Sequence, residues 1–412
     1  MDIIYTSCCG LDVHKRSIQA CVRHLDKRGR AKEEVRTFGT MTQDILALSQ
    51  WLSDREVIHV AMESTGVYWK PIYNILEGKF DLLLVNARHV KNVPGRKTDV
   101  KDCQWLAQLL QCGLLRGSFV PDKAQRELRE LTRHRTQLTH EMSAVANRIH
   151  EVLEDANIKI GAVATDILGK SCRDMIQAMI EGEESSDQTA ELARGKLRSK
   201  IPQLRLALEG NITEHHRFVL KQLMDQLNYL EGQIETFSQR IEEISRPFEE
   251  AIDAVVQLPG FKRHGAENVI SEIGCKMDQF PSDGHLSAWA GMCPGNNKTG
   301  GKSKSGKTNK GSRWLRGSLI QAAWAASKKK GSYFQARYKR LAARRGKKRA
   351  LVAVGHSPLV AIFHLIKEKN GYDELGSDFF DRLNSKRLVP YLVKRLGNLG
   401  YEVNLVPHEN TA

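Results

Sequence analysis

The chain has 412 residues, which is enough for two or three domains that each bury a core. Its composition of 41% hydrophobic and 27% charged residues is typical of a soluble globular protein and excludes fibrous and disordered classes. No apolar run approaches the length of a membrane span and no secretory signal is visible, so we expect a cytoplasmic protein with no membrane partner. The net charge of +15 favours an anionic partner.

The first part of the chain alternates between strand-like and helix-like patterns. The patterns predict strands over residues 3–14, 17–25, 33–39, 56–64 and 80–86, and helices over 42–54, 68–77 and about 99–111. The order βββαβαβ is that of an α/β RNase H-like domain with a mixed sheet. Three cysteines fall in this pattern's strands, and none of the eight in the chain forms a C-x-x-C pair, so reduced thiols are expected.

Two long helical patterns follow, between residues 119 and 252. The second is the clearer one, and its apolar residues recur every three or four positions: Leu220, Leu223, Leu227, Leu230, Ile234, Phe237, Ile241 and Ile244. This spacing predicts a coiled coil, formed either within one chain or between chains. The first pattern covers about 122–157 and has Arg135 at one seam position, while residues 160–210 read as an insertion with an acidic loop.

A mainly α-helical region is expected from residue 253 to 375, followed by a C-terminal tail over 376–412. It opens with "LPGFKRHGAENVISEIG", which resembles a helix-hairpin-helix element whose glycine turn can offer N–H groups to a phosphate. Its helical patterns place Trp314 and Trp324 beside Leu315 and Leu319, so both tryptophans are expected in the core rather than as base-stacking residues.

All of the excess positive charge lies in this region. Residues 296–350 contain 18 Lys and Arg and no Asp or Glu, whereas the rest of the chain is slightly acidic. A segment of this kind usually contacts a polyanion, most often nucleic acid, although a solvated basic face is the alternative.

Within the basic segment, "GKSKSGKT" at 301–308 fits the phosphate-loop pattern G-x-x-x-x-G-K-[ST]. A phosphate loop follows a buried strand and opens directly into a helix. Here a polar turn, "CPGNNKTG", is expected before it, and no apolar periodicity begins until Trp314. We therefore predict a flexible basic loop that contacts a nucleic-acid backbone. Its candidate contacts are Lys298, Lys302, Lys304, Lys307, Lys310, Arg313 and Arg316.

Four carboxylates in the first region have the positions that metal chemistry requires. Asp12 lies at the end of the first strand and Glu63 at the end of the fourth, while Asp99 and Asp102 are three apart at the start of a helix. Each residue alone has a structural explanation, such as helix capping or solvent exposure. Together they would repel one another unless divalent cations neutralise them, which predicts a site for Mg²⁺, with two ions per site.

The motifs "GLDVHK", "ESTGVYW" and "NARHVKNVPGRKTDVKDCQWLAQLL" resemble the RuvC-like DEDD domain of the insertion sequence 110/1111 transposases, which are relatives of the Piv invertases. "LPGF" and "AWAGMCPGNNKTGGKSKSGKTNKGSRWLRGSLIQAAWAAS" resemble the second, transposase domain of this family. The resemblance implies a RuvC-like domain over 1–118, a helical and coiled-coil region over 119–252, and a transposase domain over 253–375 that carries the nucleophile loop.

The resemblance also implies a function. Family members are bacterial or archaeal site-specific recombinases that exchange DNA strands between a donor and a target, guided by a structured non-coding RNA. It implies that Asp12, Glu63, Asp99 and Asp102 hold Mg²⁺, and that a serine forms a covalent protein–DNA intermediate in a homo-oligomer, a dimer or tetramer. Thr299 occupies the serine position here, with Ser303 and Ser305 as alternative hydroxyls.

Two other functions are compatible with these residues. A RuvC-like nuclease would use the carboxylates with water as the nucleophile and would leave no covalent adduct. A basic scaffold without catalytic activity would bind RNA or DNA and show no cleavage when Mg²⁺ is present. The covalent adduct distinguishes the recombinase from both.

Overall fold

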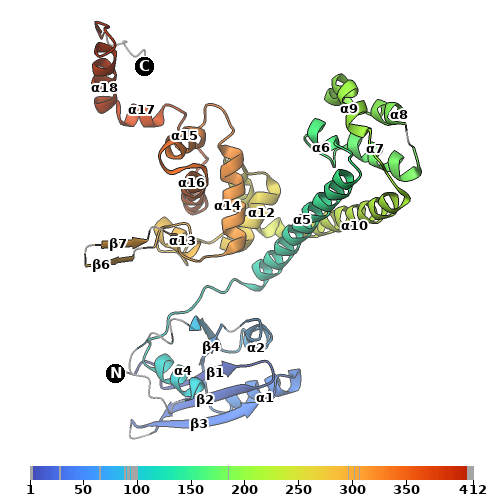
Figure 1. Cartoon of the computed structure of the whole chain (residues 1–412). Coiled ribbons are helices and arrows are strands. Elements are labelled where there is room, and N and C mark those ends of the chain that lie inside the picture. The colour runs from blue at the N-terminus through green and yellow to red at the C-terminus, as the bar shows by residue number, and fades with distance from the viewer. Residues whose placement is uncertain are drawn as a thin grey trace. The chain divides into compact units, whose positions relative to one another are not determined.

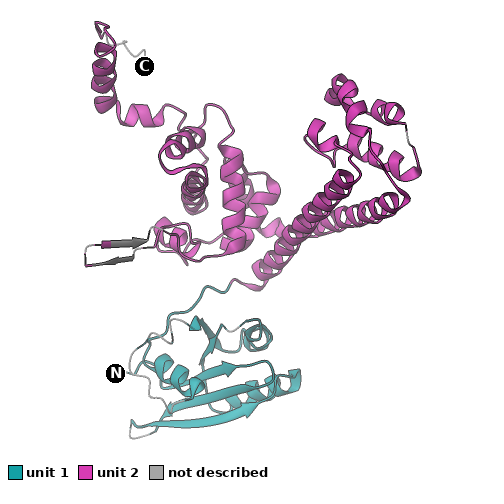
Figure 2. Cartoon of the chain, viewed as in Figure 1, with its two compact units in different colours: residues 1–120 teal, residues 121–412 magenta. Residues whose placement is uncertain are grey.

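The computed structural model describes residues 3–26, 29–64, 66–87, 90, 93, 101–183, 185–295, 297–300, 302–305 and 307–405 (Figure 1). Residues 297–299 and 303–305 are described by their backbone alone. The chain divides into two compact units, Met1–Val120 and Pro121–Ala412 (Figure 2). This boundary lies close to the predicted end of the first region. The further division at residues 253 and 376 stays a prediction.

Unit 1 contains a five-stranded mixed sheet with the strand order β3-β2-β1-β4-β5. Its strands are β1 (Ser7–Val13), β2 (Ile18–Leu25), β3 (Ala31–Phe38), β4 (His59–Glu63) and β5 (Asp81–Val85). The first three strands pair antiparallel, whereas β1–β4 and β4–β5 pair parallel. The predicted order of elements is confirmed, and the sheet is compatible with an RNase H-like fold.

Helices cover both faces of this sheet (Figure 1). Helices α1 (Thr42–Ser53) and α2 (Trp69–Leu76) share an apolar core with Leu11, Ile18 and Met62 on one face. Helix α4 (Asp102–Gln111) packs on the other face, against β1, β2 and β4. The pattern predicts a start at about residue 99, but this helix begins at Asp102, because Lys101 has an extended backbone with ψ of 151°.

Two long helices, α5 (Lys123–Asp155) and α10 (Glu214–Ser245), dominate the first half of unit 2. They pack against each other within the chain and run antiparallel, since Leu128 shares a core with Ile241 and Ile149 shares one with Leu220. Their description as a coiled coil stays a prediction. The described residues of 160–210 form four α-helices and a 3-10 helix (Gly195–Lys200) around the second of these cores. The α-helices are α6 (Ile160–Val163), α7 (Lys170–Glu181), α8 (Ser186–Glu191) and α9 (Ile201–Leu208).

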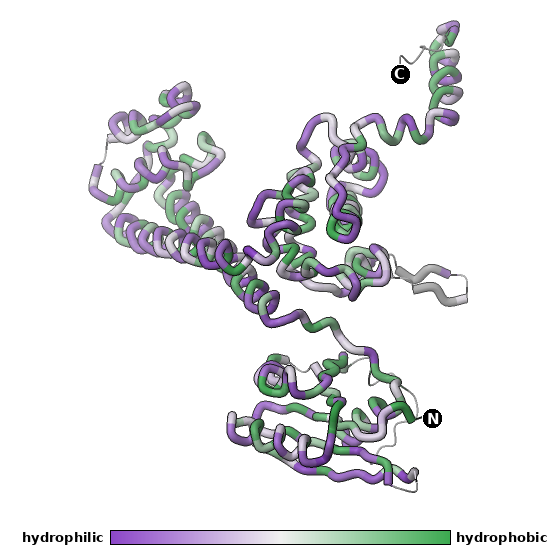
Figure 3. Tube along the Cα trace, turned by 180° about the vertical axis from the view of Figure 1, so that it is seen from behind, coloured by the Kyte–Doolittle hydropathy of each residue, from purple (hydrophilic) through white to green (hydrophobic). Residues whose placement is uncertain are grey.

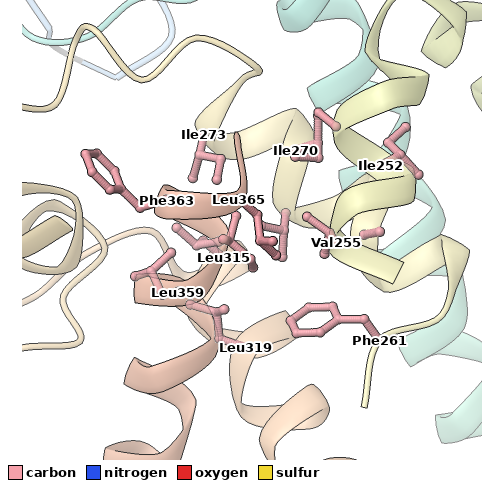
Figure 4. Packing of buried hydrophobic residues seen from close by; sticks show 14 of the residues in the cluster. Ile252, Val255, Phe261, Ile270, Ile273, Leu315, Leu319, Leu359, Phe363 and Leu365 are labelled. Carbon is pink, nitrogen blue, oxygen red and sulfur yellow. The ribbon is translucent and has the colours of Figure 1, made fainter. Parts of the chain in front are cut away.

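The remainder of unit 2 is a helical body whose apolar core extends onto Leu128 of α5 and Ile241 of α10 (Figure 4). The helices of this core are α11 (Glu249–Val256), α12 (Arg263–Ile273), α13 (Asp283–Trp289), α14 (Arg313–Ala326) and α16 (Lys347–Glu368). The turn of the "LPGF" motif is held close to α14, because a Cβ on Gly260 would lie 2.2 Å from the Ala322 carbonyl oxygen. The glycine of this motif therefore has a packing function.

Helix α16 is long and apolar enough, by length and composition alone, to cross a membrane. The expectation that the chain contains no apolar run of this length is therefore corrected. Its residues Leu359, Phe363 and Leu365 are buried in the core of unit 2 (Figure 4), and core helices of soluble proteins can be equally long and apolar.

Three further helices and a hairpin complete unit 2. Helix α15 (Tyr333–Arg345) packs on α16, and strands β6 (Asn297–Thr299) and β7 (Lys302–Ser305) form a two-stranded sheet. The tail region contains α17 (Phe379–Leu383) and α18 (Ser385–Gly397). Helix α18 has no buried residue, and apolar and polar residues alternate along it (Figure 3).

Candidate active site

The carboxylates of the first region begin with two neighbouring strands. In the parallel pair of β1 and β4, Leu11 lies opposite Met62. Continuing this register by one residue places Asp12 opposite Glu63, at the carboxyl ends of both strands. Because side chains alternate along a strand, both carboxylates lie on the sheet face opposite Leu11 and Met62, away from α1 and α2.

That face is the one covered by α4, and the two backbones are unusually close there. A Cβ on Gly10 would lie 2.3 Å from the Cys103 carbonyl oxygen and 2.5 Å from the Ala107 amide nitrogen. Only glycine allows this approach. Cys103 and Ala107 are themselves small and buried against Cys21 of β2. The first turn of α4 is thereby held over the end of β1.

This close packing brings Asp102 to the same end of the sheet. Asp102 is the first residue of α4. The next residue, Cys103, is close enough to Asp12 for the negative charge of Asp12 to act with burial in raising the pKa of the Cys103 thiol. Asp12 is also paired with His14, whose Nε2 lies 3.2 Å from the Asp12 Oδ2. Asp12 and Glu63 therefore share one face of the sheet, and Asp102 begins the helix that packs on that face.

The described residues contain no group of three or more His, Cys, Asp and Glu side chains close enough to hold a metal ion. Asp99, the fourth predicted ligand, lies outside the described residues. Carboxylate oxygens are the donors that Mg²⁺ prefers, so the chemistry of Asp12, Glu63 and Asp102 fits a divalent cation. Their assignment as a complete metal site stays a prediction.

A polar network, not anticipated from the sequence, fixes α4 to the antiparallel strands. Gln104 donates a hydrogen bond of 2.9 Å from its Nε2 to Glu33 Oε2 of β3, and Glu33 pairs with Arg23 of β2. Arg23 in turn donates a 2.6 Å hydrogen bond to Gln111 at the other end of α4. The helix is therefore held at both of its ends.

The predicted nucleophile region differs from the expectation of a flexible loop and a polar turn. Residues 297–299 and 302–305 are strands, with Thr299 paired to Lys302 and Lys298 paired to Ser303. The two intervening residues are glycines, and Gly300 has a φ of +56°, as tight hairpin turns require. Thr299 thus lies beside the hairpin turn, and the alternatives Ser303 and Ser305 lie on the opposite strand. The phosphate-loop interpretation is excluded, since α14 begins only at Arg313.

The base of the hairpin is anchored to the helical body. Pro294 and Thr308 form an antiparallel bridge, and the Gly295 amide donates a 2.8 Å hydrogen bond to the Lys307 carbonyl. At Gly291 and Gly311 the two chain segments cross so closely that a Cβ on Gly311 would lie 2.3 Å from the Ala290 carbonyl. The hairpin therefore projects from a fixed base.

The predicted nucleic-acid contacts have several different environments. Arg316 donates hydrogen bonds of 2.7 Å to Thr308 Oγ1 and 3.1 Å to the Gly291 carbonyl, so it holds the hairpin base. Arg313 lies over the Trp314 ring at 4.6 Å. Lys302, Lys307 and Lys310 are exposed, and Lys298 and Lys304 are placed on β6 and β7 by their backbone. Their roles as nucleic-acid contacts stay predictions.

The prediction that both tryptophans are core residues is wrong. Trp324 is 48% exposed and lies under Lys328, and Trp314 is half-buried between Arg313 and Arg133. The buried stripe of α14 consists of Leu315, Leu319, Ala322, Ala323 and Ala326. Small alanines next to the tryptophans supply the packing surface there.

A buried ion-pair cluster, which the sequence patterns do not reveal, joins the start of α14 to the long helix α5. Glu272 of α12 is 2% exposed and accepts hydrogen bonds of 2.7 and 3.0 Å from Arg133 of α5. It also accepts a 3.1 Å hydrogen bond from Ser312, the N-cap of α14. Arg129 lies beside it, and burial lowers the pKa of that guanidinium to about 10. The start of α14 is thereby tied to α5.

A second buried pair explains the arginine at a seam position of the first long helix. Arg135 lies 2.8 Å from Glu267 of α12, and both side chains are almost fully buried. A buried charge requires such a partner. The apolar periodicity of α5 is therefore interrupted where α12 supplies a carboxylate.

The sheet, its carboxylates and the basic helical unit fit an RNase H-like enzyme that acts on nucleic acid. Comparison with protein families makes this specific. Residues 9–158 match a DEDD-type model described as "Transposase" for IS110, and residues 253–339 match the "Transposase IS116/IS110/IS902 family". The two matches together cover more than half of the chain.

The chain therefore belongs to the IS110 family of transposases. It is a DNA-binding enzyme of transposition, and its DEDD-type domain indicates dependence on a divalent metal ion. No curated protein matches the chain.

Proposed function

We propose that this transposase is an RNA-guided, Mg²⁺-dependent recombinase that exchanges DNA strands through a covalent bond between Thr299 and a DNA phosphate. The observation that carries the proposal is the presence, in one chain, of both family domains together with an oxygen-donor face in unit 1 and a hydroxyl-bearing hairpin in unit 2. A bacterial or archaeal cytoplasm is the proposed location.

The metal site of this proposal is formed by Asp12, Glu63 and Asp102, completed by Asp99. When bound there, Mg²⁺ neutralises the charge that develops on a scissile phosphate, and two ions can serve both the attacking and the leaving oxygen. The protein's own contribution is to hold the carboxylates on a rigid face, because β1, β4 and α4 are packed through Gly10.

The covalent step is a transesterification. The Thr299 oxygen forms a bond to phosphorus, the bond to one deoxyribose oxygen breaks, and the proton lost by Thr299 is balanced by one gained at the leaving hydroxyl. The number of phosphodiester bonds is conserved, so the reverse attack by a different DNA end reseals the strand without an external energy source. Water as nucleophile would not permit this exchange.

The RNA guide and the oligomer are the remaining parts of the proposal. The basic segment 296–350 offers enough positive charge for both RNA and DNA backbones. A dimer or tetramer would allow carboxylates and hydroxyl to come from different protomers. RNase treatment of the purified complex and light scattering of its mass test these two parts separately.

The covalent step is tested with the full chain and DNA from the flanks of its reading frame. The scissile oxygen is replaced by a bridging sulfur, whose poor re-attack traps the adduct. We expect a protein–DNA band that resists denaturation, with the modified residue mapped by mass spectrometry to Thr299. Thr299→Ala should abolish this band, and Thr299→Ser should retain it because the hydroxyl is kept.

Ser303→Ala and Ser305→Ala are the matched controls, and both should form the adduct at the rate of the unaltered chain. Loss of the adduct in one of these variants, with Thr299→Ala still active, moves the nucleophile to that serine and contradicts the assignment. Cleavage without any adduct in the unaltered chain favours the nuclease.

A further inference from the structure

A basic groove lies in unit 2, beside the base of the β6–β7 hairpin. Its volume is about 1080 Å³, and it is bordered by residues of the hairpin base, α14, α15 and α16. Among the described residues that border it none is acidic, and six side chains carry a fixed positive charge: Lys307, Arg316, Arg337, Arg345, Lys348 and Arg349. Of the seven cations that sequence reasoning assigns to nucleic acid, two border this groove, Lys307 and Arg316.

The cations of the groove come from two helix faces. On α15, Arg337, Leu341 and Arg345 recur every four residues and so share one face, and on α16 Lys348 and Val352 do the same. The apolar side chains Leu341 and Val352 lie between the charged ones. The groove therefore combines cationic walls with an apolar surface, as grooves that bind a nucleic-acid strand do.

The spread of charge excludes a small anion as the ligand. Arg337 and Arg345 are separated by about 12 Å along the helix axis. One strand of B-DNA presents three or four phosphates over about that length. Several cations this near each other repel unless a polyanion runs along them. Within the described part of the chain, no acidic side chain pairs with Arg345, Lys348 or Arg349, which leaves these side chains available.

Other members of the groove have structural contacts that shape it. Arg337 donates a 2.6 Å hydrogen bond to the Tyr333 hydroxyl, and Arg316 holds the hairpin base. Burial and the charge of Arg337 lower the pKa of His356, so this side chain is neutral at physiological pH. The charge of the groove thus comes from its lysines and arginines.

We infer that this groove binds the backbone of the DNA strand that reacts at the hairpin, with Arg345, Lys348 and Arg349 contacting its phosphates. The inference rests on the proposed function in two respects, the choice of DNA over RNA and the reaction at the hairpin. Thr299 is five residues from Pro294 in the sequence, which allows at most about 17 Å between them. One DNA strand spans that distance in about five nucleotides. The groove would therefore bind phosphates up to about five nucleotides away from the scissile phosphate.

The test measures DNA binding by the full chain with two charge-matched variants. Arg345→Gln/Lys348→Gln removes two cations of the groove, and Lys386→Gln/Arg387→Gln removes two exposed cations of α18, which lies outside the basic segment and does not border the groove. All four side chains are exposed, so both variants should fold, which thermal melting checks. Fluorescence anisotropy with a labelled DNA duplex is recorded across a salt series, and a structured RNA of equal length is the second probe.

We expect the groove variant to bind DNA about ten-fold more weakly than the control variant at about 0.1 M salt. The slope of log K against log salt should decrease by about two, since two phosphate contacts are lost. Equal DNA binding by the two variants overturns the inference, as does a loss confined to RNA. Failure of the proposed function is distinguishable, because a chain that forms no covalent adduct can still show the difference in DNA binding.

Discussion

Unit 1 carries its carboxylates on strands and a helix whose backbones touch, whereas unit 2 carries its hydroxyls on a two-stranded hairpin anchored at the base. In unit 1 no Cβ fits at Gly10, and in unit 2 no described atom lies within 4 Å of a Cβ placed on Gly300. A metal site requires several oxygens to converge within a few tenths of an ångström, so rigid packing suits it. The hydroxyl that we propose as the nucleophile must approach a DNA phosphate. A two-stranded hairpin that projects from an anchored base can extend toward such a substrate.

The largest effect is expected for a substitution at the rigid carboxylate face of unit 1. Asp12→Asn keeps the shape and the contact with His14 but removes the negative charge. We expect strand cleavage to fall by a factor of about 10² or more, because the proposed metal site loses one of its charged ligands. Cleavage of a labelled substrate under single-turnover conditions measures it.

The matched control is Asp81→Asn, in the same sheet. Asp81 begins β5, at the opposite end of the strands, and pairs with His59 at 2.9 Å. Its activity should be unchanged. If both variants lose activity equally, the carboxyl ends of β1 and β4 are not the metal site.

The second prediction concerns the glycine that brings α4 to β1. Gly10→Ala should destabilise unit 1 by about 2–3 kcal/mol, because the added methyl group meets backbone atoms that cannot rotate away. Calorimetry should show a lower melting temperature for unit 1, and activity should fall with it because Asp102 is displaced. A variant with unaltered melting would show that α4 and β1 are farther apart than the structure has them.

The third prediction concerns the buried Glu272 cluster, which ties the start of α14 to α5 just after the base of the hairpin. Glu272→Gln leaves the buried Arg129 and Arg133 without a carboxylate and should destabilise unit 2 by about 1–3 kcal/mol. Amide exchange at residues 307–311 should accelerate, because Ser312 loses its charged partner. Urea unfolding and hydrogen exchange measure the two effects.

Glu249→Gln is the control for this change. Glu249 pairs with Arg263 in the same helical body, but both side chains are about 40% exposed. An exposed pair contributes about 0–1 kcal/mol, so this variant should be nearly neutral. Similar losses for Glu249 and Glu272 would contradict the claim that burial makes the Glu272 cluster the stronger anchor.

The two regions also differ in how far the sequence predicts them. The strands and helices of unit 1 follow from alternation and helical periodicity, and the positions of Asp12 and Glu63 at strand ends can be inferred from the sequence alone. The proximity of α4 could have been inferred from Gly10, since an isolated glycine in a strand marks close approach of another backbone. Asp102 falls at the start of α4 as expected, but the helix begins later than its pattern indicates.

In unit 2 the strands of the basic segment could not be predicted, because the residues around them are almost all polar or charged. "TGGK" between short polar runs is a hairpin signal, since two glycines permit the positive φ of a tight turn. Lysine and serine on both faces give no apolar alternation, so the pattern predicts a loop. The buried Glu267 and Glu272 escape prediction because each pairs with an arginine of α5 more than 130 residues away. Glu267 also pairs with Arg263 of its own helix, which does not reveal the contact with α5. Only the tertiary fold brings such groups together.

The smallest effect is expected in the hairpin of unit 2, for the same glycine-to-alanine substitution as at Gly10. Gly300→Ala adds a methyl group in open space, but its φ of +56° costs an alanine about 1 kcal/mol. Because the hairpin contributes little to the core, the cost should appear as faster amide exchange at residues 302–305 and not as a lower free energy of unfolding. A loss of global stability as large as that of Gly10→Ala would mean that the turn is packed in the native assembly, and that the hairpin reaches its substrate from a fixed position.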